Sequence, residues 1–298
     1  MAKKVLVTGS RGFTGRYVSG ALQRAGYVVC ELGGGPGGEP AAETLDLLDG
    51  DSVCRSVAAL APDYVIHLAA VAYVGHGDVE AFYRTNVVGT RNLLAALSAQ
   101  QRGPDRVVLA SSANVYGTAT AGLVDETATV SPQNDYAVSK YAMELMSRQF
   151  NDRLPIAIAR PFNYTGRGQS ESFLLPKLVA HFARRAPVVE LGNTNVYRDY
   201  SDVRRTAQAY VGLLRGAEAG EVYNICSGTE HSIADVLDML AAIAGYRIQV
   251  RVNPDFVREN DVMRLVGSPA KLEGVTGPLE AIPVADTLDW MYRGFAGA

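Results

Sequence analysis

Short apolar runs alternate with helical patterns through the first half of the chain. Runs rich in Val, Ile and Leu predict buried strands over residues 5–7, 27–32, 64–68, 106–110 and 155–160. A helix is predicted over residues 16–25, where Gly26 ends it. Strands separated by helices predict an α/β fold with a doubly wound parallel sheet.

The pattern becomes irregular after Arg160, with a helix near residues 176–185 and short strands beyond it. We interpret this part as a smaller, partly discontinuous α/β domain. The expected division is 1–164 plus about 195–224 for the dinucleotide-binding domain, and 165–194 plus about 225–298 for the substrate domain. The glycine- and proline-rich stretch 33–40 is expected to be a surface loop.

Composition excludes several classes of protein. The 28 basic and 31 acidic residues nearly balance, so nothing indicates nucleic acid as a partner. No run reaches ~18 uninterrupted apolar residues, so no membrane span is expected. The widely spaced Cys30, Cys54 and Cys226 show no disulfide or metal pattern, which indicates a reducing cytoplasm.

A glycine-rich loop follows the first predicted strand and opens the predicted helix. Its glycines are Gly9, Gly12 and Gly15, with Arg11 and Phe13 between them. Glycines let the backbone approach a pyrophosphate, whose charge the helix N-terminus stabilises. The loop therefore predicts a dinucleotide site.

The choice between NAD(H) and NADP(H) depends on an acid about 20 residues further on, which would bind the ribose 2′-hydroxyl. The second strand is predicted to end at Leu32 and to run into Gly33, where that acid is expected. Glu31 falls inside the strand pattern, whereas Arg11 can face a 2′-phosphate. We therefore favour NADP(H) and keep NAD(H) as possible.

A tyrosine and a lysine four residues apart indicate proton chemistry. On a helix, Tyr136 and Lys140 share a face, so the ammonium can approach the phenol and lower its pKa from ~10. Ser112, in the pair Ser111-Ser112, precedes them. Together with a dinucleotide loop, these residues predict hydride transfer with Tyr136 as the acid and base.

Seven motifs in order resemble the extended short-chain dehydrogenases/reductases over nearly the whole chain. They are the glycine loop, Asp46-Leu47, His67-Leu68-Ala69-Ala70, Asn86-Val87-Val88-Gly89-Thr90, Ser111-Ser112, Tyr136-x-x-x-Lys140 and Arg160-Pro161-Phe162-Asn163. The resemblance implies a Rossmann domain for the cofactor and a small C-terminal domain for a nucleotide sugar. It also implies a homodimer formed through helices near residues 79–99 and 136–150.

The resemblance also implies roles for single residues. Cofactor contacts fall to Asp46, Leu47, Leu68, Ala69, Ala70, Lys140 and Phe162, in addition to Tyr136 and the glycine loop. Catalytic roles fall to Ser112, Tyr136, Lys140 and Asn86, with Asn86 supporting a proton relay. Asn163 is expected where the cofactor and the sugar meet.

Segments of the C-terminal half resemble the GDP-sugar branch of the family. Arg198 and Arg258 can bind a diphosphate through their guanidinium groups, and Arg258-x-x-Asp261 resembles a nucleotide-contacting pattern. The implied substrate is a GDP-linked 4-keto-6-deoxyhexose. Its reduction gives GDP-6-deoxy-D-mannose (GDP-rhamnose) or GDP-6-deoxy-D-talose.

Asn114 separates this reaction from others in the family. Sugar 4,6-dehydratases usually carry a glutamate at this position, and an amide cannot abstract a proton as that carboxylate does. Asn114 therefore indicates an enzyme that moves one hydride and one proton. We expect its side chain to contact the substrate. Two alternatives stay open: a UDP-hexose 4-epimerase with tightly bound NAD, and a protein that binds dinucleotide without catalysis.

Overall fold

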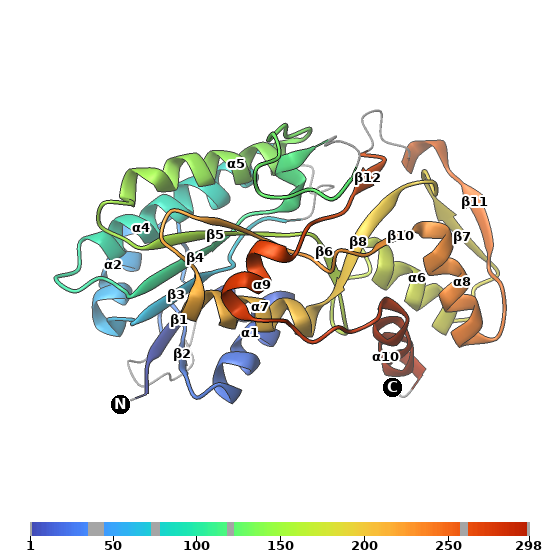
Figure 1. Ribbon diagram of the computed structural model, residues 1–298, viewed down its shortest axis with the longest axis horizontal. Helices are drawn as coiled ribbons and strands as arrows, with labels where there is room; N and C mark the ends of the chain where they lie inside the picture. The colour runs from blue at the N-terminus through green and yellow to red at the C-terminus, as the bar shows by residue number, and fades with distance from the viewer. Residues whose placement is uncertain (1, 35–44, 73–77, 118–121, 257–261, 297–298) are drawn as a thin grey trace.

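The larger lobe is built on a six-stranded parallel sheet (Figure 1). The computed structural model describes residues 2–34, 45–72, 78–117, 122–256 and 262–296. The sheet runs in the order β2 (Val28–Cys30), β1 (Lys4–Thr8), β3 (Tyr64–His67), β4 (Arg106–Ala110), β5 (Ile156–Pro161) and β9 (Val222–Ile225). This sheet confirms the predicted doubly wound Rossmann fold.

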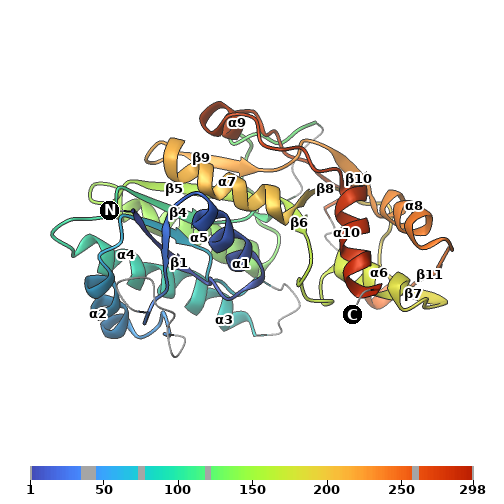
Figure 2. The ribbon, with the colours of Figure 1, turned by 90° about the horizontal axis from the view of Figure 1, so that it is seen from below.

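Helices cover both faces of the sheet, so alternate strand residues enter two different cores. Val5 and Val7 pack with α1 (Phe13–Arg24) and α7 (Val203–Gly216), which Figure 2 shows side by side over one face. Leu6, between them in sequence, points to the other face. The helices on that face are α2 (Gly50–Leu60), α4 (Thr90–Ser98) and α5 (Asp135–Ser147).

The order of the strands places a binding crevice at one edge. From β1 the chain passes to β2 on one side and then returns to β3 on the other side of β1. Ligands of such sheets bind beyond the carboxyl ends of the strands at this switch point. The glycine loop follows β1 there, and the segment from Leu68 follows β3.

The smaller lobe has its own apolar core, on the right in Figure 1. It consists of α6 (Leu174–Ala183), β7 (Val188–Leu191), α8 (Ile233–Ala244), β11 (Gln249–Val252) and α10 (Val284–Ala296). Phe182, Leu240 and Leu288 are almost fully buried in it.

Short strands link the two lobes. They are β6 (Asn163–Thr165), β8 (Tyr197–Asp202), β10 (Glu230–Ser232) and β12 (Arg264–Leu265), all paired through β8. Helix α9 (Ala270–Thr276) packs on α7 through Leu272, in the core of the larger lobe. The domain boundaries given above stay a prediction.

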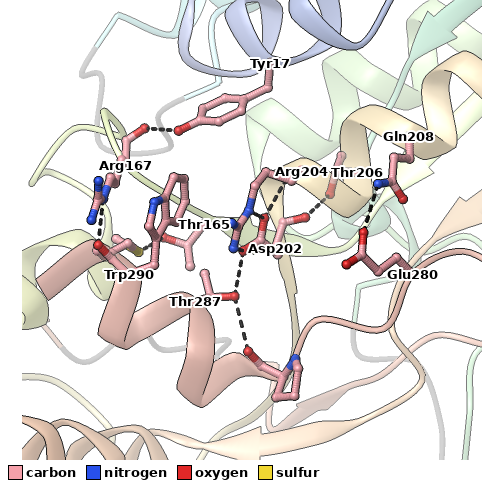
Figure 3. Close-up of polar contacts among 12 residues, drawn as sticks. Tyr17, Thr165, Arg167, Asp202, Arg204, Thr206, Gln208, Glu280, Thr287 and Trp290 are labelled. Atoms are coloured by element: carbon pink, nitrogen blue, oxygen red, sulfur yellow. Dashed lines mark hydrogen bonds and ion pairs between the residues drawn. The ribbon is translucent and has the colours of Figure 1, made fainter. Parts of the chain in front are cut away.

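Helix α10 is tied to the larger lobe through one tryptophan (Figure 3). The ring of Trp290 lies 4.1 Å from the Arg204 guanidinium and 4.9 Å from that of Arg167. Thr287, one turn earlier, donates a 2.8 Å hydrogen bond to the buried Asp202, which also caps α7. These contacts join the cofactor-side helices to the second lobe.

Two predicted boundaries are wrong. Helix α1 begins at Phe13 rather than at residue 16, because Gly12 already adopts the extended N-cap conformation. Strand β2 ends at Cys30 rather than at Leu32. A turn starts at Glu31, whose carbonyl accepts from the Gly34 amide at 3.0 Å, with Gly33 in the left-handed region (φ 79°).

No helix in the described ranges combines the length and the apolar character needed to cross a bilayer.

Candidate active site

Steric limits at three positions shape the glycine loop. Gly9 has φ 70°, and a Cβ there would lie 2.9 Å from the Ala69 amide nitrogen. A Cβ at Gly15 would lie 2.0 Å from the Gly9 carbonyl oxygen, and one at Gly12 would lie 3.1 Å from the same oxygen. The loop therefore folds closely on itself beside the end of β3.

This fold brings the N-terminus of α1 to the crevice. Gly12 caps the helix without a side chain, and no acid lies in the first turn. Amides at such a terminus bind anionic groups, so the cradle fits a dinucleotide pyrophosphate. Phe13, in the first turn, stacks on Tyr164 with ring centroids 6.1 Å apart.

A hollow beside the glycine loop has the character of an adenosine site. It is lined by Val7, Thr8, Gly9, Ser10, Arg11, Glu31, Leu32, Leu45, Leu47 and Ala69. Four of the predicted cofactor residues, Gly9, Arg11, Leu47 and Ala69, lie in this lining. Apolar walls with a few polar groups suit a planar base and its ribose.

Glu31 lies in this hollow immediately after β2. Its carboxylate accepts a 2.8 Å hydrogen bond from Ser10 and pairs with Arg11 at 3.0 Å. The interpretation of Glu31 as part of the strand was wrong, since β2 ends one residue earlier. An acid at the end of β2 is the feature that binds a ribose 2′-hydroxyl. The hollow therefore presents both an acid and an arginine at its ribose end.

The other cofactor residues implied by the resemblance lie around this crevice. Asp46 is exposed and accepts the Leu48 amide at 2.9 Å, which turns the chain into the hollow. Leu68 and Ala70 are half-buried after β3. Phe162 is buried at the end of β5, where its ring lies 6.2 Å from that of Tyr116.

Ser112, Tyr136 and Lys140 meet at the carboxyl end of β4. Asn134 caps α5 by accepting the Ala137 amide at 2.9 Å, which places Tyr136 and Lys140 on one buried face of the helix. Ser112 follows β4 and hydrogen bonds to the Tyr136 phenol. The Lys140 ammonium donates to the carbonyl of Ala110, the last residue of β4, at 2.8 Å.

The electrostatics of this trio differ from the sequence prediction. Burial raises the pKa of Tyr136 to about 12, although the hydrogen bond with Ser112 lowers it. Burial also lowers the pKa of Lys140 to about 8, which the charge of Glu144 opposes. The expectation that Lys140 lowers the pKa of Tyr136 was wrong, because desolvation dominates. The phenol is thus protonated at neutral pH and suited to donate a proton.

Asn86 supports the trio from a π-helical turn, η1 (Arg84–Gly89), between α3 (Val79–Tyr83) and α4. Its amide accepts the Val71 amide at 3.0 Å and donates to the Val71 carbonyl at 3.1 Å. It also donates to Ser139 at 3.0 Å, on the helix that carries Tyr136. Asn86 therefore fixes both the segment after β3 and the start of α5.

Asn114 lies next to the trio. Its backbone N–H donates to the Ser112 hydroxyl at 3.2 Å, at the start of the 3-10 turn η2 (Ala113–Tyr116). Asn163 is exposed on β6, and Arg198 on β8 donates to the Tyr197 carbonyl at 2.9 Å.

Arg258 and Asp261 fall outside the described residues. The substrate contacts implied for them, and for Asn163 and Arg198, stay predictions.

The sequence analysis missed Glu144, a buried acid behind the trio. It forms a bidentate ion pair with Arg160 on β5, at 2.9 and 2.6 Å, and accepts from Ser111. Its position four residues after Lys140 is the signal that could have found it, since that spacing repeats the helix face.

The chain belongs to the NAD dependent epimerase/dehydratase family, whose profile matches residues 5–226. It is therefore a nicotinamide-dependent enzyme of the extended short-chain dehydrogenase/reductase type, which confirms the resemblance inferred from the motifs.

Three relatives are similar over almost the whole chain. A GDP-6-deoxy-D-talose 4-dehydrogenase of Aggregatibacter actinomycetemcomitans is 32% identical, covering 97% of each chain. A GDP-6-deoxy-D-mannose reductase of Pseudomonas aeruginosa is 36% identical, covering 98% of this chain and 99% of the relative. The structure of RMD from Pseudomonas aeruginosa complexed with NADPH has a TM-score of 0.88 at 33% identity, covering 100% and 98%. These similarities support a GDP-sugar oxidoreductase.

Proposed function

We propose that this protein reduces the 4-keto group of a GDP-4-keto-6-deoxyhexose with NAD(P)H. The product is GDP-6-deoxy-D-mannose or GDP-6-deoxy-D-talose. The observation that carries the proposal is Asn114, whose backbone amide donates to the hydroxyl of Ser112. It leaves this position without the acid that a dehydratase needs, in a chain similar throughout to GDP-6-deoxyhexose reductases and dehydrogenases.

The mechanism uses residues that already lie together. The sugar ketone would lie against Ser112 and Tyr136, and a nicotinamide bound in the crevice would supply the hydride. Tyr136 donates its proton to the developing alkoxide, and a hydrogen bond from Ser112 stabilises that charge. A phenol with a pKa of about 12 holds its proton until the alkoxide forms. The Lys140 ammonium, on the same buried face of α5, supplies positive charge at the carboxyl end of β4.

The ligand assignments complete the proposal. NADP(H) is favoured because Arg11 faces the ribose end of the hollow and the RMD relative is complexed with NADPH. NAD(H) remains possible through Glu31. Arg198, Arg258 and Asp261 are the candidates for contacts with the GDP moiety.

The second candidate is a UDP-hexose 4-epimerase with tightly bound NAD. Glu31 favours it, because an acid directly after β2 suits the ribose 2′-hydroxyl of NAD. In this alternative, the same trio would first remove a proton and later return it.

A homodimer and a cytoplasmic location belong to the same proposal. Exposed apolar side chains lie on the helical segments predicted to form the dimer, namely Val79, Val88, Val138 and Leu145. The described cysteines, Cys30, Cys54 and Cys226, form no disulfide, as suits a reducing compartment.

The first test measures NADPH oxidation with enzymatically prepared GDP-4-keto-6-deoxy-D-mannose and determines the C4 configuration of the product by NMR. Tyr136→Phe should lower turnover at least ~100-fold, because it removes the proton donor. Tyr141→Phe, on the same helix, is the matched control and should retain turnover. If neither NADPH nor NADH is consumed, the reductase proposal fails and the epimerase becomes the candidate to assay.

A further inference from the structure

Glu144 is a buried carboxylate that the proposed mechanism does not use. It lies on α5 one turn after Lys140, and only 3% of the residue is exposed. Both oxygens bind Arg160, at 2.9 Å to Nε and 2.6 Å to Nη2. The Ser111 hydroxyl donates to one of the same oxygens.

The bond to Ser111 connects Glu144 to the segment that carries the catalytic serine. Ser111 lies between Ala110 and Ser112. The carbonyl of Ala110 accepts a hydrogen bond from the Lys140 ammonium, and Ser112 hydrogen bonds to Tyr136. The Ser111 amide is also fixed, since it donates to Ala159 on β5 at 2.7 Å. Holding the hydroxyl of Ser111 therefore fixes the direction in which the next residue leaves β4.

A second connection runs through space to Lys140. A buried ammonium loses water and is easier to deprotonate, whereas a nearby carboxylate favours the charged form. Glu144 supplies that opposing charge from the next turn of the same helix. The other titratable groups facing Lys140 are Tyr136 on α5 and His67 on β3. His67 has its pKa lowered to about 3 by burial, so it is neutral at ordinary pH.

The far side of the network holds Glu144 in place. The Arg160 guanidinium lies 4.8 Å from the centre of the Tyr116 ring. Tyr116 in turn donates to the side-chain oxygen of Asn224 on β9 at 2.8 Å. A buried ion pair with every partner satisfied is rigid, and removing one member leaves an uncompensated charge.

We propose that Glu144 is a positioning residue of the active site, which orients Ser112 through Ser111 and holds Lys140 in its charged form. This inference rests on the proposed catalytic roles of Ser112 and Lys140. It adds that the Glu144–Arg160 pair serves catalysis as well as packing.

The two effects of Glu144 can be separated by two substitutions. Glu144→Gln removes the charge of the side chain but keeps its shape, so the pKa of Lys140 should fall. The basic limb of the kcat–pH profile, which we assign to deprotonation of Lys140, should therefore move to lower pH by roughly one unit. Ser111→Ala leaves the carboxylate and Lys140 untouched. It should lower kcat roughly 10-fold through misplacement of Ser112, with KM and the basic limb unchanged.

A double variant guards against misfolding. Glu144→Gln leaves Arg160 buried without a counter-charge, which destabilises the protein. Glu144→Gln with Arg160→Met removes both charges and should fold, since apolar replacements of buried pairs are often tolerated. The double variant should show the same shift of the basic limb of the kcat–pH profile to lower pH as Glu144→Gln. A folded double variant with the wild-type limb and wild-type kcat would mean that the pair is structural only.

A readout without substrate separates this inference from the proposed function. ¹³Cε NMR of lysine-labelled protein, with the resonance assigned through Lys140→Met, follows the titration of Lys140 directly. Its pKa should be about 8 in the wild type and lower in Glu144→Gln. An unchanged titration refutes the electrostatic role even in an active enzyme. A lowered pKa of Lys140 in Glu144→Gln, in a protein that does not reduce the GDP sugar, would support the electrostatic role and refute the proposed substrate.

Discussion

Gly15 and Gly20 both lie on α1, but they differ in the room they leave for a side chain. At Gly15 a side chain would collide with the Gly9 carbonyl, at 2.0 Å from the added Cβ. At Gly20 the nearest atom is the end of the flexible Arg24 side chain, at 3.4 Å. Backbone is rigid here and a side-chain end is not, so only Gly15 is required by the fold of the loop.

Gly15→Ala should therefore abolish measurable NAD(P)H binding, because the glycine loop must open to admit the methyl group. Gly20→Ala should bind NAD(P)H normally and be more stable by about 0.5–1 kcal/mol, since alanine suits a helix interior better. Fluorescence titration with NADPH and thermal unfolding by circular dichroism measure the two effects. Equal affinity in both variants would contradict the assignment of the loop as the pyrophosphate cradle.

The roles of single residues can be predicted from the sequence where local sterics decide them. The glycine loop and the Tyr136–Lys140 spacing were readable because each depends on neighbours a few residues away. The pKa of Tyr136 was not, since it depends on burial by segments far apart in the chain. Glu31 was misread for a related reason, as its place depends on where β2 stops pairing with β1.

Helix α10 joins the lobes in addition to the short strands paired through β8. Trp290 is the sole tryptophan of the chain, and its ring contacts the guanidinium groups of Arg204 on α7 and of Arg167 in the segment after β6. Tyr17 of α1 adds an edge-to-face contact with ring centroids 6.3 Å apart, and its hydroxyl donates to the Arg167 carbonyl (Figure 3). The helix that follows the glycine loop is thereby in contact with the substrate-side lobe.

Trp290→Ala should lower stability by at least about 1–2 kcal/mol, the sum for two partly exposed cation–π contacts, because the ring also packs against the core of the smaller lobe. It should also raise the KM for the sugar nucleotide more than that for NAD(P)H, because α10 belongs to the second lobe. Trp290→Phe keeps an aromatic ring, so its stability and its KM for the sugar nucleotide should lie between those of the wild type and of Trp290→Ala. Thermal unfolding by circular dichroism and steady-state kinetics test this, and a loss confined to NAD(P)H would refute the interpretation.

Elements were predictable where one pattern decides them. Strands β1, β4 and β5 are apolar runs buried on both sides, which periodicity detects. Strand β8 reads Tyr-Arg-Asp-Tyr-Ser-Asp, and three of its polar residues, Asp199, Ser201 and Asp202, are buried. Asp199, for example, accepts hydrogen bonds from Ser227 and Gly228. No local pattern announces such a strand, so the architecture of the lobe junction could not be predicted.

The whole molecule presents an apolar surface on the helices beside the trio. Val79 and Val88 lie on the α3–η1 run, and Val138 and Leu145 lie on α5, each between 39% and 49% exposed. These helices pack against one another, so the four side chains belong to one side of the larger lobe. Two copies meeting there would bury this surface in a bundle of four helical segments, as the dimer proposal requires.

The double variant Val88→Lys and Leu145→Lys tests that assembly. Both side chains already contact solvent, so the charges should be tolerated by the single subunit but not by an apolar interface. Analytical ultracentrifugation should show a dimer for the wild type and a monomer for the variant. Val252→Lys is the control, since Val252 is 59% exposed but lies on β11 in the second lobe. A wild-type monomer, or a variant that still sediments as a dimer, would exclude this face as the interface. Because Asn86 and Tyr136 lie on the same helical segments, a monomer should also lose kcat, which the same preparations would reveal.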